Sequence, residues 1–182
     1  MKTKINKIDQ LGFIVDNIEE AAMHWVNTCG VGPFFIHQNV EYEKFTYMNE
    51  DTPVQLTLAF SYIGSIMLEL IYQHNDAPSV YTALKHRSGN GLIHVASFCD
   101  DLEIITNSLT PEDIIQYSST PDGVETIYLN TEHHNGGLVE FIKMPEIYKP
   151  ITELFQKTVA NWNGERPLRY IDPTNPFAVL DL

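Results

Sequence analysis

The chain has 182 residues and carries 24 acidic against 11 basic side chains, which gives a formal net charge of -13. A hydrophobic content of 43% excludes a disordered protein, and the lack of any Lys/Arg cluster argues against a nucleic-acid partner. This length suits one ordinary domain with its own hydrophobic core, and the acidity disfavours polyanionic substrates.

The N-terminus, the longest uncharged stretch and the cysteines bear on where the protein works. Residues 1–7 are basic but have no apolar core, unlike a secretory signal. Residues 52–68 are too few and too polar to span a bilayer. A single pair of cysteines, Cys29 and Cys99, is expected to be two reduced core thiols. We therefore expect a cytoplasmic protein with no membrane partner.

The first half of the chain is predicted to begin with a strand and a helix. Alternating apolar residues predict a strand at 7–15, and the following helix is capped at Asp16-Asn17 and stopped by Gly30. Aromatic and β-branched residues then predict extended structure over 34–40 and 42–48, followed by strands at 54–62 and 66–72. We interpret residues 7–72 as a βαβββ module.

The second half repeats this order after a connector that holds a short helical piece near 80–86. Residues 91–145 are predicted to form a second βαβββ module, with elements at 92–99, 101–109, 114–118, 124–130 and 137–143. Residues 146–182 should form an amphipathic helix at 150–162 and an extended tail that packs on a neighbouring surface. The predicted fold class is α+β, with two modules forming a sheet-lined cleft in a domain of residues 1–145.

Two pairs of polar residues recur at equivalent places in the two halves. Gln10 and His94 are 84 residues apart, and each lies early in an apolar strand that breaks at an acidic turn. Glu69 and Glu140 are 71 residues apart, and each places a carboxylate in the middle of an otherwise apolar strand. If the modules pack about a pseudo-two-fold axis, these four side chains can meet at one point in the cleft.

These four residue types together favour a metal site. Taken singly, each is more often a hydrogen-bonded or solvent-facing strand residue, but a buried carboxylate is costly unless it is paired or bound to a metal. One imidazole, one amide oxygen and two carboxylates form a mostly hard ligand set with room for two waters. Such a set suits a divalent ion such as Zn, Ni, Co, Mn or Mg, and open positions are typical of a catalytic site.

Four segments carry a resemblance to a known family: residues 8–15, 67–71, 91–96 and 138–141. They resemble the vicinal oxygen chelate superfamily, which includes glyoxalase I, methylmalonyl-CoA epimerase, extradiol dioxygenases and bleomycin-resistance proteins. The resemblance covers residues 7–145, and residues 160–169 are similar to the tail of a glyoxalase-like subgroup. It implies paired βαβββ modules that line a metal cleft, and a homodimer.

This resemblance also implies a chemistry. The set Gln10, Glu69, His94 and Glu140 resembles the ligands of animal glyoxalase I, which implies a metal-dependent lyase or isomerase. Such an enzyme abstracts a proton next to a carbonyl of a small substrate chelated through two oxygens. Glu140, or alternatively Glu69, would be the general base, while Gln10 and His94 would stay ligands. The alternatives are a protein that binds or sequesters a small molecule, and a methylmalonyl-CoA epimerase-like isomerase.

Some positions depart from the glyoxalase I pattern or allow two interpretations. Ile14 and Asn90 stand where glyoxalase I holds glutathione with arginines, which disfavours glutathione as substrate. The run Glu132-His133-His134 is interpreted as a polar hairpin turn, with an accessory metal or proton-relay group as the alternative. Four aromatic residues line an apolar pocket or, for most of them, pack within the sheet: Tyr42, Phe45, Tyr47 and Phe60.

Overall fold

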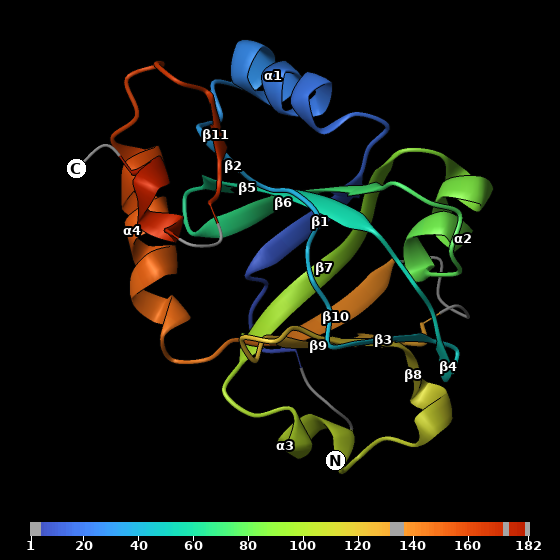
Figure 1. Ribbon diagram of the computed structural model, residues 1–182. Helices are drawn as coiled ribbons and strands as arrows, with labels where there is room; N and C mark the ends of the chain where they lie inside the picture. Colours follow the sequence, from blue (N-terminus) through green and yellow to red (C-terminus); the bar gives the residue numbers. More distant parts are fainter. Residues whose placement is uncertain (1–4, 132–136, 173–174, 181–182) are drawn as a thin grey trace.

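A computed structural model describes residues 5–131, 137–172 and 175–180 (Figure 1). Its strands are β1 (Gln10–Ile14), β2 (Phe34–His37), β3 (Lys44–Tyr47), β4 (Glu50–Asp51), β5 (Leu56–Ile63), β6 (Ile66–Gln73), β7 (Gly91–Cys99), β8 (Ile114–Ser119), β9 (Glu125–Leu129), β10 (Leu138–Lys143) and β11 (Leu168–Tyr170). Its helices are α1 (Ile18–Cys29), α2 (Val80–Ser88), α3 (Glu103–Thr106) and α4 (Tyr148–Ala160), with short 3-10 helices at Pro111–Asp113 and Pro176–Val179.

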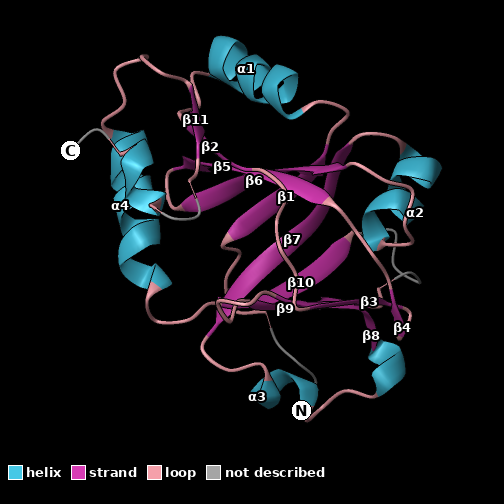
Figure 2. Cartoon of the chain, viewed as in Figure 1, coloured by secondary structure: helices cyan, strands magenta, loops and turns pink. Residues whose placement is uncertain are grey.

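The strands form one curled sheet in the order β11-β2-β5-β6-β1-β7-β10-β9-β8-β3-β4 (Figure 2). Its centre consists of two βαβββ modules, because β1 pairs in parallel with β6 and β7 pairs in parallel with β10. Strands β1 and β7 run antiparallel and join the modules, as a two-fold relation between them requires. The predicted α+β fold of two such modules is confirmed.

Helices α1 and α3 cover the outer face of the sheet (Figure 2). Ile18 and Ala22 of α1 pack on Leu68 and Leu70 of β6. In the second module, Ile105 of α3 and Leu102 just before this helix pack on Ile127 and Phe141. Because side chains alternate along a strand, the residues between these apolar positions point to the inner face.

The inner face carries two apolar clusters with a gap between them. One cluster lies toward α2 and includes Tyr81, Ile71 and Leu138. The other lies toward α4, where Phe155 stacks on Phe35 of β2 with ring centroids 4.0 Å apart. Figure 1 shows α2 and α4 at opposite ends of the curled sheet. Any polar group between the clusters is therefore shielded from solvent on both sides.

Residues 38–55, which we call the strap, connect β2 to β5 and cross in front of β1, β7 and β10 (Figure 1). The strap contains β3 and β4, and β3 pairs with β8 of the second module. The prediction that the strand at 42–48 belongs to the first module was therefore wrong. Its β-forming sequence specifies a strand but not a partner, and the path of the connection decides which edge it joins.

Capping residues in the sequence predicted the ends of α1 correctly. Asn17 caps α1 by accepting hydrogen bonds from the backbone of Glu19 and Glu20, and Gly30 ends this helix with a φ of 67°. Helix α3 covers only residues 103–106 of the predicted 101–109, and the residue at its start, Leu102, makes no side-chain cap. The tail after α4 contains strand β11, which pairs in parallel with β2 of the same chain, and a 3-10 helix at Pro176–Val179.

The cysteines are both free, as expected, although Cys29 is exposed and Cys99 half-buried, so neither is a fully buried core thiol. Within the described part of the chain, none of the helices combines the length and the apolar character that crossing a bilayer requires.

Candidate metal centre

Each of the four central strands contributes one polar side chain to the gap between the two apolar clusters. Glu69 comes from β6, Gln10 from β1, His94 from β7 and Glu140 from β10. Their exposed fractions are 7%, 2%, 1% and 3% respectively. The structure thus brings the four predicted residues together in the interior. They converge because their strands are adjacent and the polar positions all face inward.

Nε2 of His94 is the hub of this group. It lies 3.1 Å from Oε2 of Glu140, 3.5 Å from Oε2 of Glu69 and 3.3 Å from Oε1 of Gln10. Ligand atoms about 2.1 Å from one ion are separated by roughly 3.0 Å at octahedral angles and roughly 3.4 Å at tetrahedral angles. The spacings from the imidazole nitrogen therefore match those of donors that share a divalent cation.

The amide of Gln10 is oriented so that its oxygen faces the centre. Its Nε2 donates to Sδ of Met67, 3.2 Å away on the neighbouring strand, and its Oε1 points at His94. Met67 lies directly opposite Gln10 in the β1–β6 register. A thioether sulfur is only a weak acceptor, but here it occupies the amide nitrogen and leaves the harder oxygen for a cation.

Gly12 makes room for the imidazole of His94. The two residues are paired across β1 and β7, and a Cβ atom on Gly12 would collide with three atoms of the ring. The same register pairs Gln10 with Ala96, so each module places a small residue opposite the other module's polar side chain. The packing of the centre thus depends on small residues at positions 12 and 96.

Burial dominates the electrostatics of the group. It raises the pKa of Glu69 to about 8, and it raises the pKa of Glu140 well above its ordinary value, with the nearby Glu69 carboxylate adding to the rise. Burial also lowers the pKa of His94 to about 3. Two carboxylates are therefore held in a place that disfavours their charge, and a cation between them would remove this penalty.

The donor set and its unsatisfied atoms fit a divalent ion. Glu69, His94 and Glu140 each offer a ligand atom, and these atoms all lie within 4.8 Å of one another. Oε2 of Glu140 and Nδ1 of His94 have no hydrogen-bond partner among the described residues. Buried polar atoms are rarely left unpaired, so the carboxylate oxygen that faces Nε2 of His94 suits a metal ligand. Gln10 supplies the fourth donor.

Two tyrosines that the sequence did not single out support Glu140. Tyr128 lies opposite Glu140 in the β9–β10 register and hydrogen-bonds its carboxylate, which offsets part of the rise in its pKa. The Tyr128 hydroxyl is 3.0 Å from that of Tyr81 on α2, and its ring meets the His94 ring edge-on at 5.4 Å. The sequence could not mark Tyr128 as a partner of Glu140, because any strand residue that faces inward alternates with an outward neighbour such as Ile127. Only the pairing register of β9 with β10 places the two side chains together.

The other candidate residues lie away from the centre or outside the description. Ile14 is buried in the apolar cluster near α2, and Asn90 donates to Asp16 at the surface, so neither provides a cation for a substrate. Glu132-His133-His134 lie outside the described residues. All four aromatic residues pack in or against the inner clusters, and two of them, Tyr42 and Phe45, also line a pocket.

Comparison with known proteins identifies a family and similar solved structures. The family described as the Glyoxalase/Bleomycin resistance protein/Dioxygenase superfamily matches residues 9–125. A hypothetical protein from Bacillus halodurans has a TM-score of 0.54 at 19% identity, covering 79% of this chain and 97% of its own. Methylmalonyl-CoA epimerase from Mycobacterium tuberculosis has a TM-score of 0.52 at 14% identity, covering 77% of this chain and 89% of its own.

A variant of Streptomyces coelicolor methylmalonyl-CoA epimerase in complex with 2-nitronate-propionyl-CoA has a TM-score of 0.52 at 17% identity, covering 79% of this chain and 98% of its own. At these identities, the likeness to the solved structures shows a shared fold. No curated protein sequence matches the chain significantly.

Proposed function

Because the chain belongs to the glyoxalase/bleomycin resistance protein/dioxygenase superfamily, we propose that it is a divalent-metal-dependent lyase or isomerase. In this proposal it abstracts a proton next to a carbonyl of a small substrate that offers two neighbouring oxygens. The observation that supports it most is the buried convergence of Gln10, Glu69, His94 and Glu140. The metal could be Zn, Ni, Co, Mn or Mg, since the mixed oxygen and nitrogen donors accept all of them.

When bound, the ion would supply Lewis-acid stabilisation of the negative charge that develops on the substrate oxygen. Gln10 and His94 are proposed as ligands that stay in place. The contact to Met67 fixes the amide of Gln10, and His94 is held between Gly12 and Tyr128. These two side chains therefore orient the centre and take no proton in the reaction.

Glu140 is proposed as the general base, with Glu69 as the alternative. The carboxylate of Glu140 has one oxygen without a hydrogen-bond partner among the described residues, and Tyr128 orients the group. Once released from the ion, the carboxylate would be a stronger base than an exposed one, because burial raises its pKa in the absence of a metal. In this proposal the Glu140 carboxylate is a ligand that would loosen from the ion to take the proton.

The proposed proton abstraction can be measured without a known product. We expect the metal-loaded protein to exchange the carbon-bound hydrogen of α-hydroxyketones or of α-ketoaldehyde–thiol adducts with solvent deuterium, followed by NMR. Glu140→Gln should slow this exchange by about 10²- to 10⁴-fold, as expected for loss of a general base. Each variant should be assayed at a metal concentration that saturates it, because the substitution also removes a ligand.

Glu153→Gln, on the exposed side of α4, is the matched control and should exchange hydrogen at the wild-type rate. Full exchange by the saturated Glu140→Gln variant would contradict the assignment of the base. If Glu69→Gln alone abolished exchange, the base would be Glu69.

All four proposed ligands come from one chain, so the centre does not need a partner subunit. We expect calorimetric titration to give one ion per chain, with an affinity that is the same at low and high protein concentration. A homodimer, which the family resemblance implies, would then pair two complete centres. An affinity that falls on dilution would instead indicate a centre shared between subunits.

Two other functions keep some support. Ile14 and Asn90 in place of glutathione-binding arginines, together with the aromatic content, favour a protein that binds or sequesters a small molecule. Wild-type protein that takes up no divalent ion would point to this function. Epimerisation of an acyl-CoA is supported by the shared fold with methylmalonyl-CoA epimerases. A direct assay of thioester epimerisation would separate this activity from the one proposed.

A further inference from the structure

A pocket lies between the two arms of the strap. Backbone hydrogen bonds join the arms at both ends, from Val40 to Leu56 and from Thr52 to Phe45. Between these ties the outgoing arm is also anchored to β8, through the bond from the Glu43 amide to Ser119. The arms diverge between the anchors and line a pocket of about 770 Å³ that is open to solvent. A volume of this size suits a small organic ligand.

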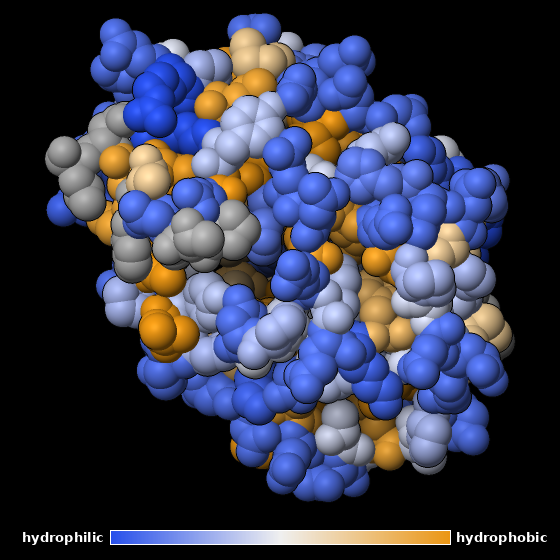
Figure 3. All heavy atoms as spheres, in the orientation of Figure 1, coloured by the Kyte–Doolittle hydropathy of each residue, from blue (hydrophilic) through white to orange (hydrophobic). Residues whose placement is uncertain are grey.

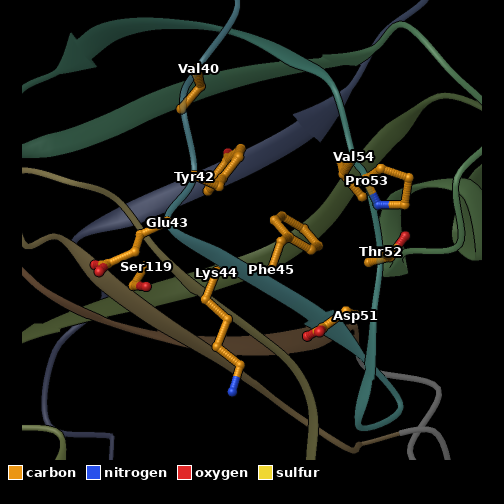
Figure 4. Close-up of a pocket in the computed structure, with 10 residues that line it drawn as sticks. All are labelled: Val40, Tyr42, Glu43, Lys44, Phe45, Asp51, Thr52, Pro53, Val54 and Ser119. Carbon is orange, nitrogen blue, oxygen red and sulfur yellow. The ribbon is translucent and has the colours of Figure 1, made fainter.

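The floor of the pocket is made of side chains that belong to the inner core. Tyr42, Phe45 and Val54 line the pocket, and all three pack against the apolar cluster that contains Tyr128 and Leu138. Figure 4 shows the rings of Tyr42 and Phe45 in the space between the arms. The two rings meet edge-on at 5.0 Å. This floor therefore separates the pocket from the surroundings of the metal centre.

Tyr42 has the pocket on one side and the carboxylates of the centre on the other. It packs against the cluster that contains Tyr128, whose ring meets the His94 ring edge-on at 5.4 Å. The charges of Glu69 and Glu140 also add to the rise that burial causes in the pKa of Tyr42. Its side chain is only partly buried, because the face that lines the pocket stays accessible.

On this basis we propose that the pocket between the strap arms binds the body of the substrate. The two oxygens of the substrate would pass Tyr42 to reach the metal centre. The inference rests on the proposed function, because it needs a metal centre to which the pocket leads. Figure 3 shows a mostly hydrophilic outer surface on the face that the strap crosses.

The lining selects the chemical class of the ligand. Apolar and aromatic side chains form the interior, while the charged groups Glu43, Lys44 and Asp51 are exposed at the edge. One cation against two carboxylates cannot hold a group rich in phosphate, which needs an excess of Arg or Lys. The pocket therefore fits a compact ligand with an apolar or aromatic body and no phosphates. A CoA thioester does not meet this description.

The test uses benzohydroxamate as probe, because it has an aromatic ring and two neighbouring oxygens. Co²⁺ is first titrated into wild-type protein, and the visible Co²⁺ absorption then reports binding of the probe. Pro53→Trp fills the pocket and should weaken probe binding by about tenfold or more, with Co²⁺ affinity unchanged. Tyr42→Ala should speed probe binding by about tenfold. Free coenzyme A should not compete.

Ile63→Trp, which places the same side chain at the exposed end of β5, is the control and should behave as wild type. If Co²⁺ binds but Pro53→Trp and Tyr42→Ala leave probe binding unchanged, or the probe does not bind, the pocket assignment is overturned and the metal centre stands. Competition by coenzyme A would overturn the ligand class. If wild-type protein fails to bind Co²⁺, the proposed function falls, and the pocket inference falls with it.

Discussion

Small residues at the centre of the sheet decide whether the buried polar group can form. His94 occupies the space above Gly12 that any Cβ would fill, and Gln10 lies opposite Ala96. An imidazole placed this close to the backbone of the next strand has few other orientations. Its Nε2 is therefore fixed toward Glu69 and Glu140 by packing, without a hydrogen bond to Nδ1.

Gly12→Ala is expected to disrupt the centre. The new Cβ would force the His94 ring or β1 to move, and such overpacking costs about 1–3 kcal/mol of stability. Displacement of the imidazole should also weaken divalent-ion binding by about tenfold or more. Calorimetric titration and urea denaturation would measure the two effects.

The double variant Gly12→Ala/His94→Ala separates the clash from the loss of the ligand. Removing the ring relieves the collision, so the two substitutions should be strongly non-additive in unfolding free energy, while ion binding stays weak. Additive stabilities would mean that the clash is absorbed elsewhere.

At the scale of elements, α4 and the strap convert an open curled sheet into a closed interior. Helix α4 covers one end of the inner face through Phe155, and the strap crosses the middle. The strap also ties the modules together, because β3 hydrogen-bonds to β8. The βαβββ modules therefore place the four ligands, whereas the added elements control what can reach them.

Phe155→Ala should destabilise the protein by about 3 kcal/mol or more, because it removes a buried ring stacked on Phe35 and leaves a cavity. Urea denaturation should show a lower midpoint at unchanged slope. Glu153→Ala, on the exposed side of the same helix, should cost at most about 0.5 kcal/mol. Equal effects of the two substitutions would show that α4 does not hold the inner face.

At the scale of the whole molecule, the buried acids link folding to pH. Metal-free protein keeps protons on Glu69 up to about pH 8, whereas an unfolded chain releases them near pH 4.5. Stability from this group is therefore present below pH 4.5 and is lost as the pH rises toward 8. His94 has the opposite effect on stability, because its pKa is lowered from 6.5 to about 3. Its stabilising contribution is fully present above pH 6.5, so it does not change stability between pH 6.5 and 8.

We expect the metal-free protein to lose stability between pH 6.5 and 8, by about 1.4 kcal/mol per pH unit for each carboxylate that stays protonated. Urea denaturation across this range would measure the slope. Glu69→Gln should make it shallower, since the amide has no proton to release. Saturation with a divalent ion should remove the fall, because the ion stabilises the ionised carboxylates. A stability that rises over this range in metal-free protein would refute the linkage.

The sequence by itself determined the modules and the candidate residues of the centre. Glu69 and Glu140 stood out as single carboxylates within apolar strands, and the repeat paired Gln10 with His94. These signals are local, because the direction of a strand side chain and the cap of a helix depend on a few neighbouring residues. The division between a domain of residues 1–145 and a C-terminal segment stays a prediction, since α4 and β11 both pack on the first module.

The tertiary structure alone decided the partners. The pairing of β3 with β8, the place of Tyr128 beside Glu140 and the room that Gly12 leaves for His94 all depend on register between segments far apart in the chain. The same holds for the burial of the centre, because α4 and the strap could have left the inner face open with the same local sequence. Contacts of this kind depend on how whole elements pack, and no short pattern of residues encodes them.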